Sequence, residues 1–256
     1  MGKNEIVVVS GLGNATGTGA SVARLFASEG FRVALVSRPR HEVDSLKAEI
    51  NKAGGQAEIF SLDDYNYGSI TKVFRDVQEK WKDARIKSAI WNTAQWSHIP
   101  FMDIGQDDIE RSVRINIVSA TAFAQAAVKA FTADGSEEEK GGSIIMTGAT
   151  SAWRGKENFG AFAAGKHGLR ALSQSIAREW GPQGVHVAFV VIDGTILTTR
   201  TKANFGSRPD KEANWLRDEK QRLSPDSIAQ TYLFLHRQGP DAWTLEMDLR
   251  PAKEKF

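Results

Sequence analysis

Short apolar runs rich in β-branched residues alternate along the chain with longer stretches in which apolar residues recur at helical spacing. The first pattern is typical of buried strands, and the second of helices with one face against a core. The runs predict strands at residues 5–10, 32–37, 57–61, 86–91, 143–148, 185–192 and, less regularly, 244–248. The helical stretches lie between them, at 17–29, 41–53, 68–82, 107–132, 159–180 and 225–236. This order predicts an α/β fold: a Rossmann-type doubly wound parallel sheet of seven strands, with helices on both faces.

The totals limit the domain organisation and the kind of partner. The chain has 256 residues, of which 41% are hydrophobic, so we expect a single domain, residues 1–256, around one core. A formal net charge of +2 is too small to attract nucleic acid or a membrane surface, so we expect a small-molecule substrate. The chain has no cysteine, which excludes thiol nucleophiles and thiolate sites, and no metal is expected. The first apolar run is too short for a signal peptide, so we expect a cytoplasmic protein.

One long segment is unlike the rest. Residues 196–222 follow the sixth predicted strand and are polar and charged, with scattered Phe205, Trp215 and Leu216. That composition is typical of a long functional loop and not of a core. Because open parallel sheets bind ligands outside the carboxyl ends of their strands, we predict that this segment is a flap covering a substrate.

A glycine-rich loop joins the first strand to the first helix. It contains Gly11, Gly13, Gly17 and Gly19, and the helical run follows at once. Glycine permits positive φ and close approach of backbone N–H groups to a pyrophosphate, whose charge is stabilised at a helix N-terminus. Strand, glycines and helix in this order predict a dinucleotide site.

The end of the second strand indicates which dinucleotide is preferred. An NAD-specific site places a carboxylate there to accept hydrogen bonds from the ribose 2′-hydroxyl, but this strand ends in Ser37 and Arg38, with Arg40 close behind. A guanidinium can bind a 2′-phosphate through charge-assisted hydrogen bonds. We therefore predict NADP(H) as the preferred cofactor, with NAD(H) possible; the alternative is that both arginines are ordinary surface charges.

These residues resemble the short-chain dehydrogenase/reductase family along essentially the whole chain. Gly13, Gly17 and Gly19 match its G-x-x-x-G-x-G spacing, although Gly11 resembles the usual first glycine in a loop two residues longer. Three further segments also match the family. An aspartate after the third strand stands where the family contacts the adenine, and Asn-Thr-Ala-Gln after the fourth strand resembles the family's Asn-Asn-Ala-Gly. After the sixth strand, Asp-Gly replaces the family's Pro-Gly beside the nicotinamide. The predicted cofactor contacts are Gly11, Gly13, Asn14, Thr16, Gly17, Thr18, Gly19, Ser37, Arg38, Asp63, Asp64, Asn92, Ala94, Gln95, Lys166, Asp193, Gly194, Ile196 and Thr198.

The catalytic positions depart from the family. The resemblance implies that Lys166 binds the nicotinamide ribose and that Asn116 holds a water for a proton relay. Phe162 stands four residues before Lys166, where the family has the catalytic Tyr, and Ala149 stands at the Ser position. A benzene ring cannot donate a proton and a methyl group cannot hydrogen-bond a carbonyl, so the usual mechanism is excluded. The neighbouring sequence resembles a divergent branch that also carries Phe at the Tyr position.

Four other residues are candidates to replace the lost groups. Thr150 and Ser151 follow the fifth strand, His98 follows the fourth-strand motif, and Asp193 lies where the family has proline beside the nicotinamide. In protonated form Asp193 could supply the proton, and water is the remaining donor. The leading hypothesis is thus an NADP(H)-dependent oxidoreductase of a carbonyl or alcohol with an atypical mechanism.

Two other kinds of protein stay open at this point. One is a non-redox isomerase, lyase or cyclase on the same scaffold, and the other is a catalytically silent NADP(H)-binding protein. The family also implies a homodimer or homotetramer through helices 107–132 and 159–180. The alanines Ala120, Ala122, Ala124, Ala126 and Ala127 suit close packing of helices either within or between subunits.

Overall fold

The computed structural model describes residues 4–133, 140–206 and 218–253. Its sheet has seven parallel strands in the order β3-β2-β1-β4-β5-β6-β7, which confirms the predicted doubly wound fold. The order reverses direction between β1 and β4, where such folds place their ligands. The strands are β1 (Glu5–Ser10), β2 (Arg32–Ser37), β3 (Gln56–Ser61), β4 (Arg85–Trp91), β5 (Gly142–Thr147), β6 (Val185–Ile192) and β7 (Glu246–Leu249). Only β7 differs notably from its prediction, since it begins two residues later than 244.

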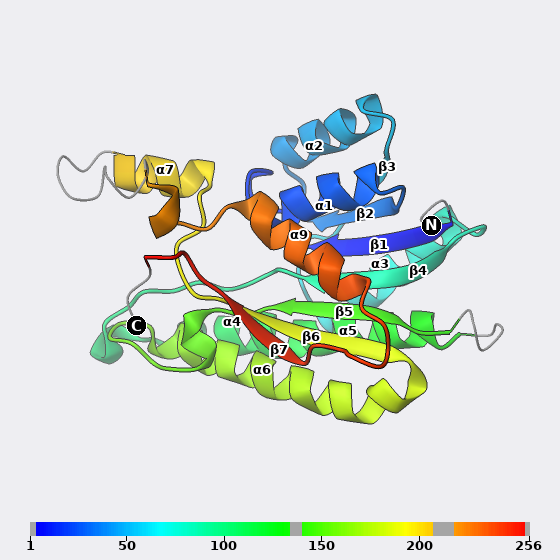
Figure 1. Cartoon of the computed structure of the whole chain (residues 1–256). Coiled ribbons are helices and arrows are strands. Elements are labelled where there is room, and N and C mark those ends of the chain that lie inside the picture. The colour runs from blue at the N-terminus through cyan, green and yellow to red at the C-terminus, as the bar shows by residue number, and fades with distance from the viewer. Residues whose placement is uncertain (1–3, 134–139, 207–217, 254–256) are drawn as a thin grey trace.

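Helices cover both faces of the sheet (Figure 1). Within β1, Val7 and Val9 point into the core on one face, whereas Ile6 and Val8 point into the core on the other. A strand buried on both faces explains the unbroken apolar runs in the sequence. One face carries α1 (Thr18–Ser28), α2 (His41–Lys52) and α9 (Pro225–His236); the other carries α3 (Tyr67–Lys80), α4 (Gln106–Val113), α5 (Ala120–Phe131) and α6 (Gly160–Trp180).

The stretch predicted as one helix over 107–132 is divided. A π-helical segment, Arg114–Ser119, separates α4 from α5. The Ser119 hydroxyl donates to the Arg114 carbonyl at 2.8 Å and also to the carbonyl of Tyr65. Single π-helical turns inside longer helices are frequent at functional sites, and this one contains Asn116. A regular helix was therefore the wrong prediction for these residues.

The alanines of α5 contact the chain's own core. The five alanines named from the sequence, Ala120, Ala122, Ala124, Ala126 and Ala127, are at most 6% exposed, so they serve packing within the subunit. Within the described residues there are also four 3₁₀ turns: Phe101–Asp103, Thr150–Ala152, Gly181–Gln183 and Glu219–Gln221. No helix in the described ranges is long and apolar enough to cross a bilayer.

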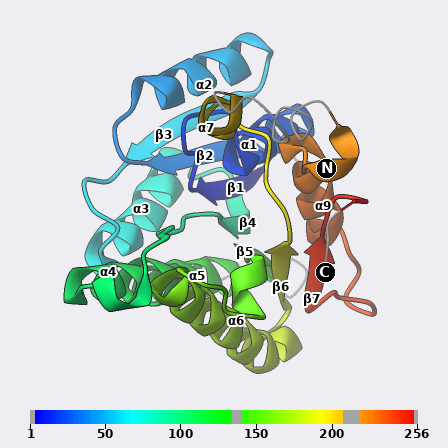
Figure 2. The ribbon, with the colours of Figure 1, turned by 90° about the vertical axis from the view of Figure 1, so that its left-hand side faces the viewer.

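The predicted flap, residues 196–222, contains α7 (Thr199–Gly206), which lies beyond the carboxyl ends of the strands (Figure 2). The two ends of the flap are joined, because Leu197 N donates to Leu223 O and Leu223 N donates to Thr195 O, both at 2.9 Å. Residues 207–217, including Trp215 and Leu216, lie outside the described residues. The described part thus places α7 over the edge where the cofactor is expected.

Candidate cofactor and active site

The glycine loop is pressed against the end of β4. Gly11 has φ +91°, and a Cβ on it would lie 2.4 Å from the carbonyl carbon of Asn92. A Cβ on Gly19 would lie 2.5 Å from Gly11 O, and Asn92 Nδ2 donates to that same oxygen at 2.7 Å. Gly13 also has positive φ but open space around it. The loop therefore packs against the end of β4 through Gly11 and Gly19. This agrees with the alignment in which Gly11 is the first glycine and the loop is two residues longer than usual.

The start of α1 suits an anionic group. Gly17 is the N-cap and gives no side-chain hydrogen bond, and the first turn carries no acidic residue. The buried Thr18 hydroxyl has no hydrogen-bond partner among the described residues. Free N–H groups and an unpartnered hydroxyl at a helix N-terminus are what a pyrophosphate requires, so these residues fit a dinucleotide.

The longer glycine loop contacts the flap. The Thr16 hydroxyl donates to Asn14 Oδ1 at 2.8 Å and accepts from Thr199 N at 3.1 Å. A Cβ on Gly17 would lie 3.5 Å from the Thr198 methyl group. The structure thus brings together Asn14, Thr16, Gly17 and Thr198, which are four of the residues predicted to contact a cofactor. Gly194 and Ile196 lead into this contact, and Ile196 forms a bridge with Leu223.

The residues predicted to contact the adenosine end include the exposed Arg38 and two aspartates in different surroundings. Arg38 is exposed at the end of β2, pairs with no described acidic residue, and follows the buried Ser37. Asp63 is exposed, whereas the Asp64 carboxylate lies 3.6 Å from the Arg114 guanidinium. Arg38 and Asp63 are therefore free to bind a ligand, but Asp64 is occupied by an ion pair.

Lys166 is buried at the carboxyl end of β5. It is 2% exposed, its Nζ donates to Thr147 O at 2.8 Å, and Nζ lies 5.9 Å from the centre of the Phe162 ring. Burial lowers the pKa of Lys166 to about 7, because the charged form loses hydration. The amine can thus change charge near neutral pH, which the sequence did not indicate.

Asn116 lies against the helix that carries Lys166. A Cβ on Gly165 would lie 2.7 Å from Asn116 Nδ2, which donates to Ser112 O at 3.0 Å. The Asn116 Oδ1 atom is buried and has no partner among the described residues. This unpartnered oxygen fits the expectation that Asn116 holds a water.

Thr150 and Asp193 bind each other. The Thr150 hydroxyl donates to Asp193 Oδ1 at 2.5 Å, and Asp193 Oδ2 lies 3.3 Å from Arg250 Nη2. Asp193 is 3% exposed, so both carboxylate oxygens face protein groups. The sequence suggested Asp193 as a proton donor, but these contacts make it an acceptor that joins β6 to the chain after β7. The Thr150 hydroxyl is therefore already used in the hydrogen bond to Asp193. The next residue, Ser151, is buried, and Ala149 directly precedes Thr150 in the chain.

Two aromatic residues near Phe162, Trp96 and Phe159, were not predicted from the sequence, and both contact the candidate His98. The exposed His98 ring lies 4.8 Å from the ring of Phe159, which lies 6.4 Å from Phe162. Trp96 contacts both His98 and Phe159. The sequence feature that could have indicated this cluster is the presence of two aromatic residues soon after Asn92 and a third three residues before Phe162. Ala94 and Gln95 lie between Asn92 and this cluster, at the same strand end.

No tyrosine replaces Phe162 in the described structure. Tyr232 is fully buried on α9, where its hydroxyl hydrogen-bonds the Thr147 side chain at 2.7 Å, and burial raises its pKa. Tyr65 packs against Trp91, and Tyr67 hydrogen-bonds Gln125 on the outside of the molecule. Each of the three tyrosines is thus engaged elsewhere in the fold.

Fold and site together define a dinucleotide-binding oxidoreductase, and comparisons with known proteins agree. A family model described as "Enoyl-(Acyl carrier protein) reductase" matches residues 11–244, and the chain belongs to the short-chain dehydrogenase/reductase family. It is similar to 3beta-hydroxysteroid dehydrogenase of Mediterraneibacter gnavus, with 23% identity over 91% of this chain and 89% of that protein. D-threitol dehydrogenase of Mycolicibacterium smegmatis is 26% identical, over 87% of this chain and 83% of that protein.

Solved structures show the same fold. A short-chain dehydrogenase from Rhodopseudomonas palustris is 29% identical, with a TM-score of 0.77 over 97% of this chain and 99% of that one. A metagenomic short-chain oxidoreductase in complex with NADP has a TM-score of 0.77 at 21% identity, over 98% of each chain. With relatives named as dehydrogenases and reductases, the chain is an enzyme of the oxidoreductase class.

Proposed function

We propose that the chain is an NADP(H)-dependent oxidoreductase of a small carbonyl compound or alcohol, working without the usual Tyr and Ser. The observation that carries this proposal is the close contact of Gly11 and Gly19 at Asn92, beside an uncapped helix start and the unpartnered Thr18 hydroxyl. The exposed, unpaired Arg38 supports NADP(H) over NAD(H), since it can pair with a 2′-phosphate.

The chain's own residues would bind the cofactor and position the water needed for proton transfer. When bound, the nicotinamide supplies or accepts a hydride. Lys166 holds the ribose hydroxyls, and Asn116 holds a water with its free Oδ1. Phe162 and Ala149 can neither donate a proton nor hydrogen-bond a carbonyl, which costs roughly 10²- to 10³-fold in rate for each lost group.

The proton must then come from another group at the same edge. His98 and Ser151 remain candidates with water, and Lys166 joins them because its pKa is near 7. Thr150 and Asp193 are less suited, since each is occupied by the other. We also propose that the chain belongs to a divergent branch in which Phe162 is an inherited feature, supported by the sequence around Thr147–Ser151.

A second candidate rests on Phe162 and Ala149 themselves. Two apolar side chains in place of the acid and the hydrogen-bond donor suit a non-redox isomerase, lyase or cyclase, or a silent NADP(H)-binding protein. Hydride transfer distinguishes these from an oxidoreductase.

The test uses NADPH that carries deuterium at nicotinamide C4, in separate samples for each face, incubated with a broad metabolite extract. Deuterium in a product, lost in the variant Lys166→Ala, would support the oxidoreductase; His98→Ala, Ser151→Ala and Asp193→Asn would then identify the proton donor. NADPH binding, followed by energy transfer from tryptophan, would be measured alongside. Tight binding with no transferred label would favour the second candidate.

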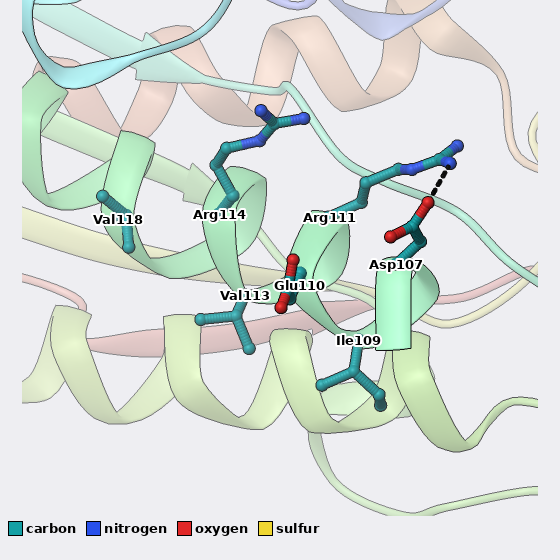
Figure 3. Close-up of a pocket in the computed structure, with 7 residues that line it drawn as sticks. All are labelled: Asp107, Ile109, Glu110, Arg111, Val113, Arg114 and Val118. Carbon is teal, nitrogen blue, oxygen red and sulfur yellow. Dashed lines mark hydrogen bonds and ion pairs between the residues drawn. The ribbon is translucent and has the colours of Figure 1, made fainter. Parts of the chain in front are cut away.

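We further propose a cytoplasmic homodimer or homotetramer. Support comes from an apolar outer face on α4 and the π-helix, where Ile109, Val113 and Val118 are 38–44% exposed around a hollow of about 520 Å³ (Figure 3). Asp107 and Arg111 form an ion pair at its edge. The chain lacks the family's Asp-Gly-Gly after β7, which leaves dimer or tetramer open; light scattering of Val118→Asp against the native chain decides whether this face is the interface.

A further inference from the structure

Four aromatic rings form a row from the segment after β4 to the first turn of α6. Trp96 and His98 stack, with centroids 6.3 Å apart and planes 13° apart. Phe159 stands edge-on to His98 at 4.8 Å and to Trp96 at 6.1 Å, and Phe162 follows at 6.4 Å from Phe159. We call these four residues the aromatic row; it ends at the position where the family has its catalytic Tyr.

The aromatic row is held in place from two sides. Ile99 N donates to Asn158 O at 2.7 Å, which ties the segment after β4 to the loop before α6. Phe162 is 7% exposed and lies in α6, near the buried amine of Lys166. The row therefore has a fixed position relative to the site proposed for the nicotinamide.

The aromatic row is also open to solvent. Trp96 is 54% exposed and His98 is exposed, although large rings that serve only packing are normally covered. Phe101 and Met102, further along the same segment, are 81% and 88% exposed. An apolar surface that is both fixed and uncovered beside a reaction site indicates a ligand wall.

We infer that the aromatic row is the substrate-binding wall and that the substrate carries its reacting carbonyl or alcohol next to a planar aromatic or conjugated ring. Rings favour offset and edge-on contacts with other rings, and a saturated ring of the same size lacks them. The row contains no permanently charged side chain, which fits a neutral substrate. This inference rests on the proposed function, because it places the substrate beside the site proposed for the nicotinamide.

The experiment compares two ketones with the same number of carbon atoms, acetophenone and cyclohexyl methyl ketone. Binding of each is titrated by ligand-observed NMR, with and without saturating NADPH, and NADPH binding is measured separately. The variants are Trp96→Leu and Phe159→Leu. The matched control is Phe234→Leu, which removes a ring that is 56% exposed on α9, on the other face of the sheet.

Acetophenone is expected to bind roughly three- to tenfold more tightly than the saturated ketone, and each row variant to remove most of that preference. The control and the NADPH affinity stay unchanged. Equal binding of the two ketones, no binding of either, or a preference that survives both row variants overturns the inference. Loss of the proposed function is recognised separately, since it would show as absent NADPH binding while the ketone titrations without cofactor still report on the row.

Discussion

Lys166 offers a test in which stability and function move in opposite directions. Its ordinary pKa is 10.5, and burial lowers it to about 7 in the folded chain. Between these values the unfolded chain keeps a proton that the folded chain gives up, so stability rises with pH through this window. At about 1.4 kcal/mol per pH unit, the charged amine costs the fold on the order of 5 kcal/mol below pH 7.

The informative variant is Lys166→Met, which keeps the length of the side chain and removes the charge. It also removes the hydrogen bond to Thr147 O, at a cost of about 1 to 3 kcal/mol. The variant is therefore expected to be more stable by about 2 to 4 kcal/mol at pH 7, or roughly 4 to 16 °C in Tm. The advantage should fall as pH rises and reverse near about pH 9, while NADPH binding and activity decrease.

The assay is urea unfolding of the cofactor-free protein at intervals from pH 6 to pH 10, for the native chain and the variant. Lys156→Met is the control, because Lys156 is exposed on the loop before α6 and its substitution should leave the pH profile unchanged. A difference between the native chain and Lys166→Met that stays constant across the range would show that the amine keeps its hydration, and the reasoning from burial would be wrong.

Three further predictions follow from the same site. Arg38→Ala should weaken NADPH binding by roughly ten- to a hundredfold and leave NADH binding unchanged, as fluorescence titrations would show; equal losses would contradict the 2′-phosphate contact. Gly11→Ala should cost more than about 2 kcal/mol of stability and abolish cofactor binding, because its Cβ meets the Asn92 backbone. The matched change Gly155→Ala, into open space, should be neutral in thermal unfolding. Phe162→Tyr combined with Ala149→Ser should raise the rate of ketone reduction by roughly 10²-fold or more, and an unchanged rate would argue against redox chemistry at this site.

The features that could be predicted from sequence are local. The run Val185–Ile192 is apolar throughout because both of its faces are buried, so its strand was evident from eight consecutive residues. The glycine loop was evident for the same reason, since strand, glycines and helix start follow one another directly. The family resemblance, through the spacing to Lys166, predicts that Phe162 and Ala149 occupy the Tyr and Ser positions, and this assignment stays a prediction.

The features that could not be predicted depend on contacts between distant residues. Arg250, just after β7, forms an ion pair with Asp193, just after the neighbouring strand β6. No pattern in the sequence around Asp193 predicts this partner. The π-helix at Arg114–Ser119 depends on a hydroxyl that reaches back to Arg114 O and across to Tyr65 O. The depressed pKa of Lys166 depends on how deeply α6 buries the amine, which no residue pattern measures.

The contact between Thr16 and Thr199 has a consequence for chimeric enzymes. The hydroxyl that anchors the first residue of α7 belongs to the loop between Gly11 and Gly17, so exchanging that loop for a shorter one removes the anchor as well. A graft of the loop alone would remove the acceptor of the Thr199 N–H, and a graft of the flap alone would need a loop that supplies this acceptor. The two segments therefore form a single exchangeable module, and a successful graft carries both.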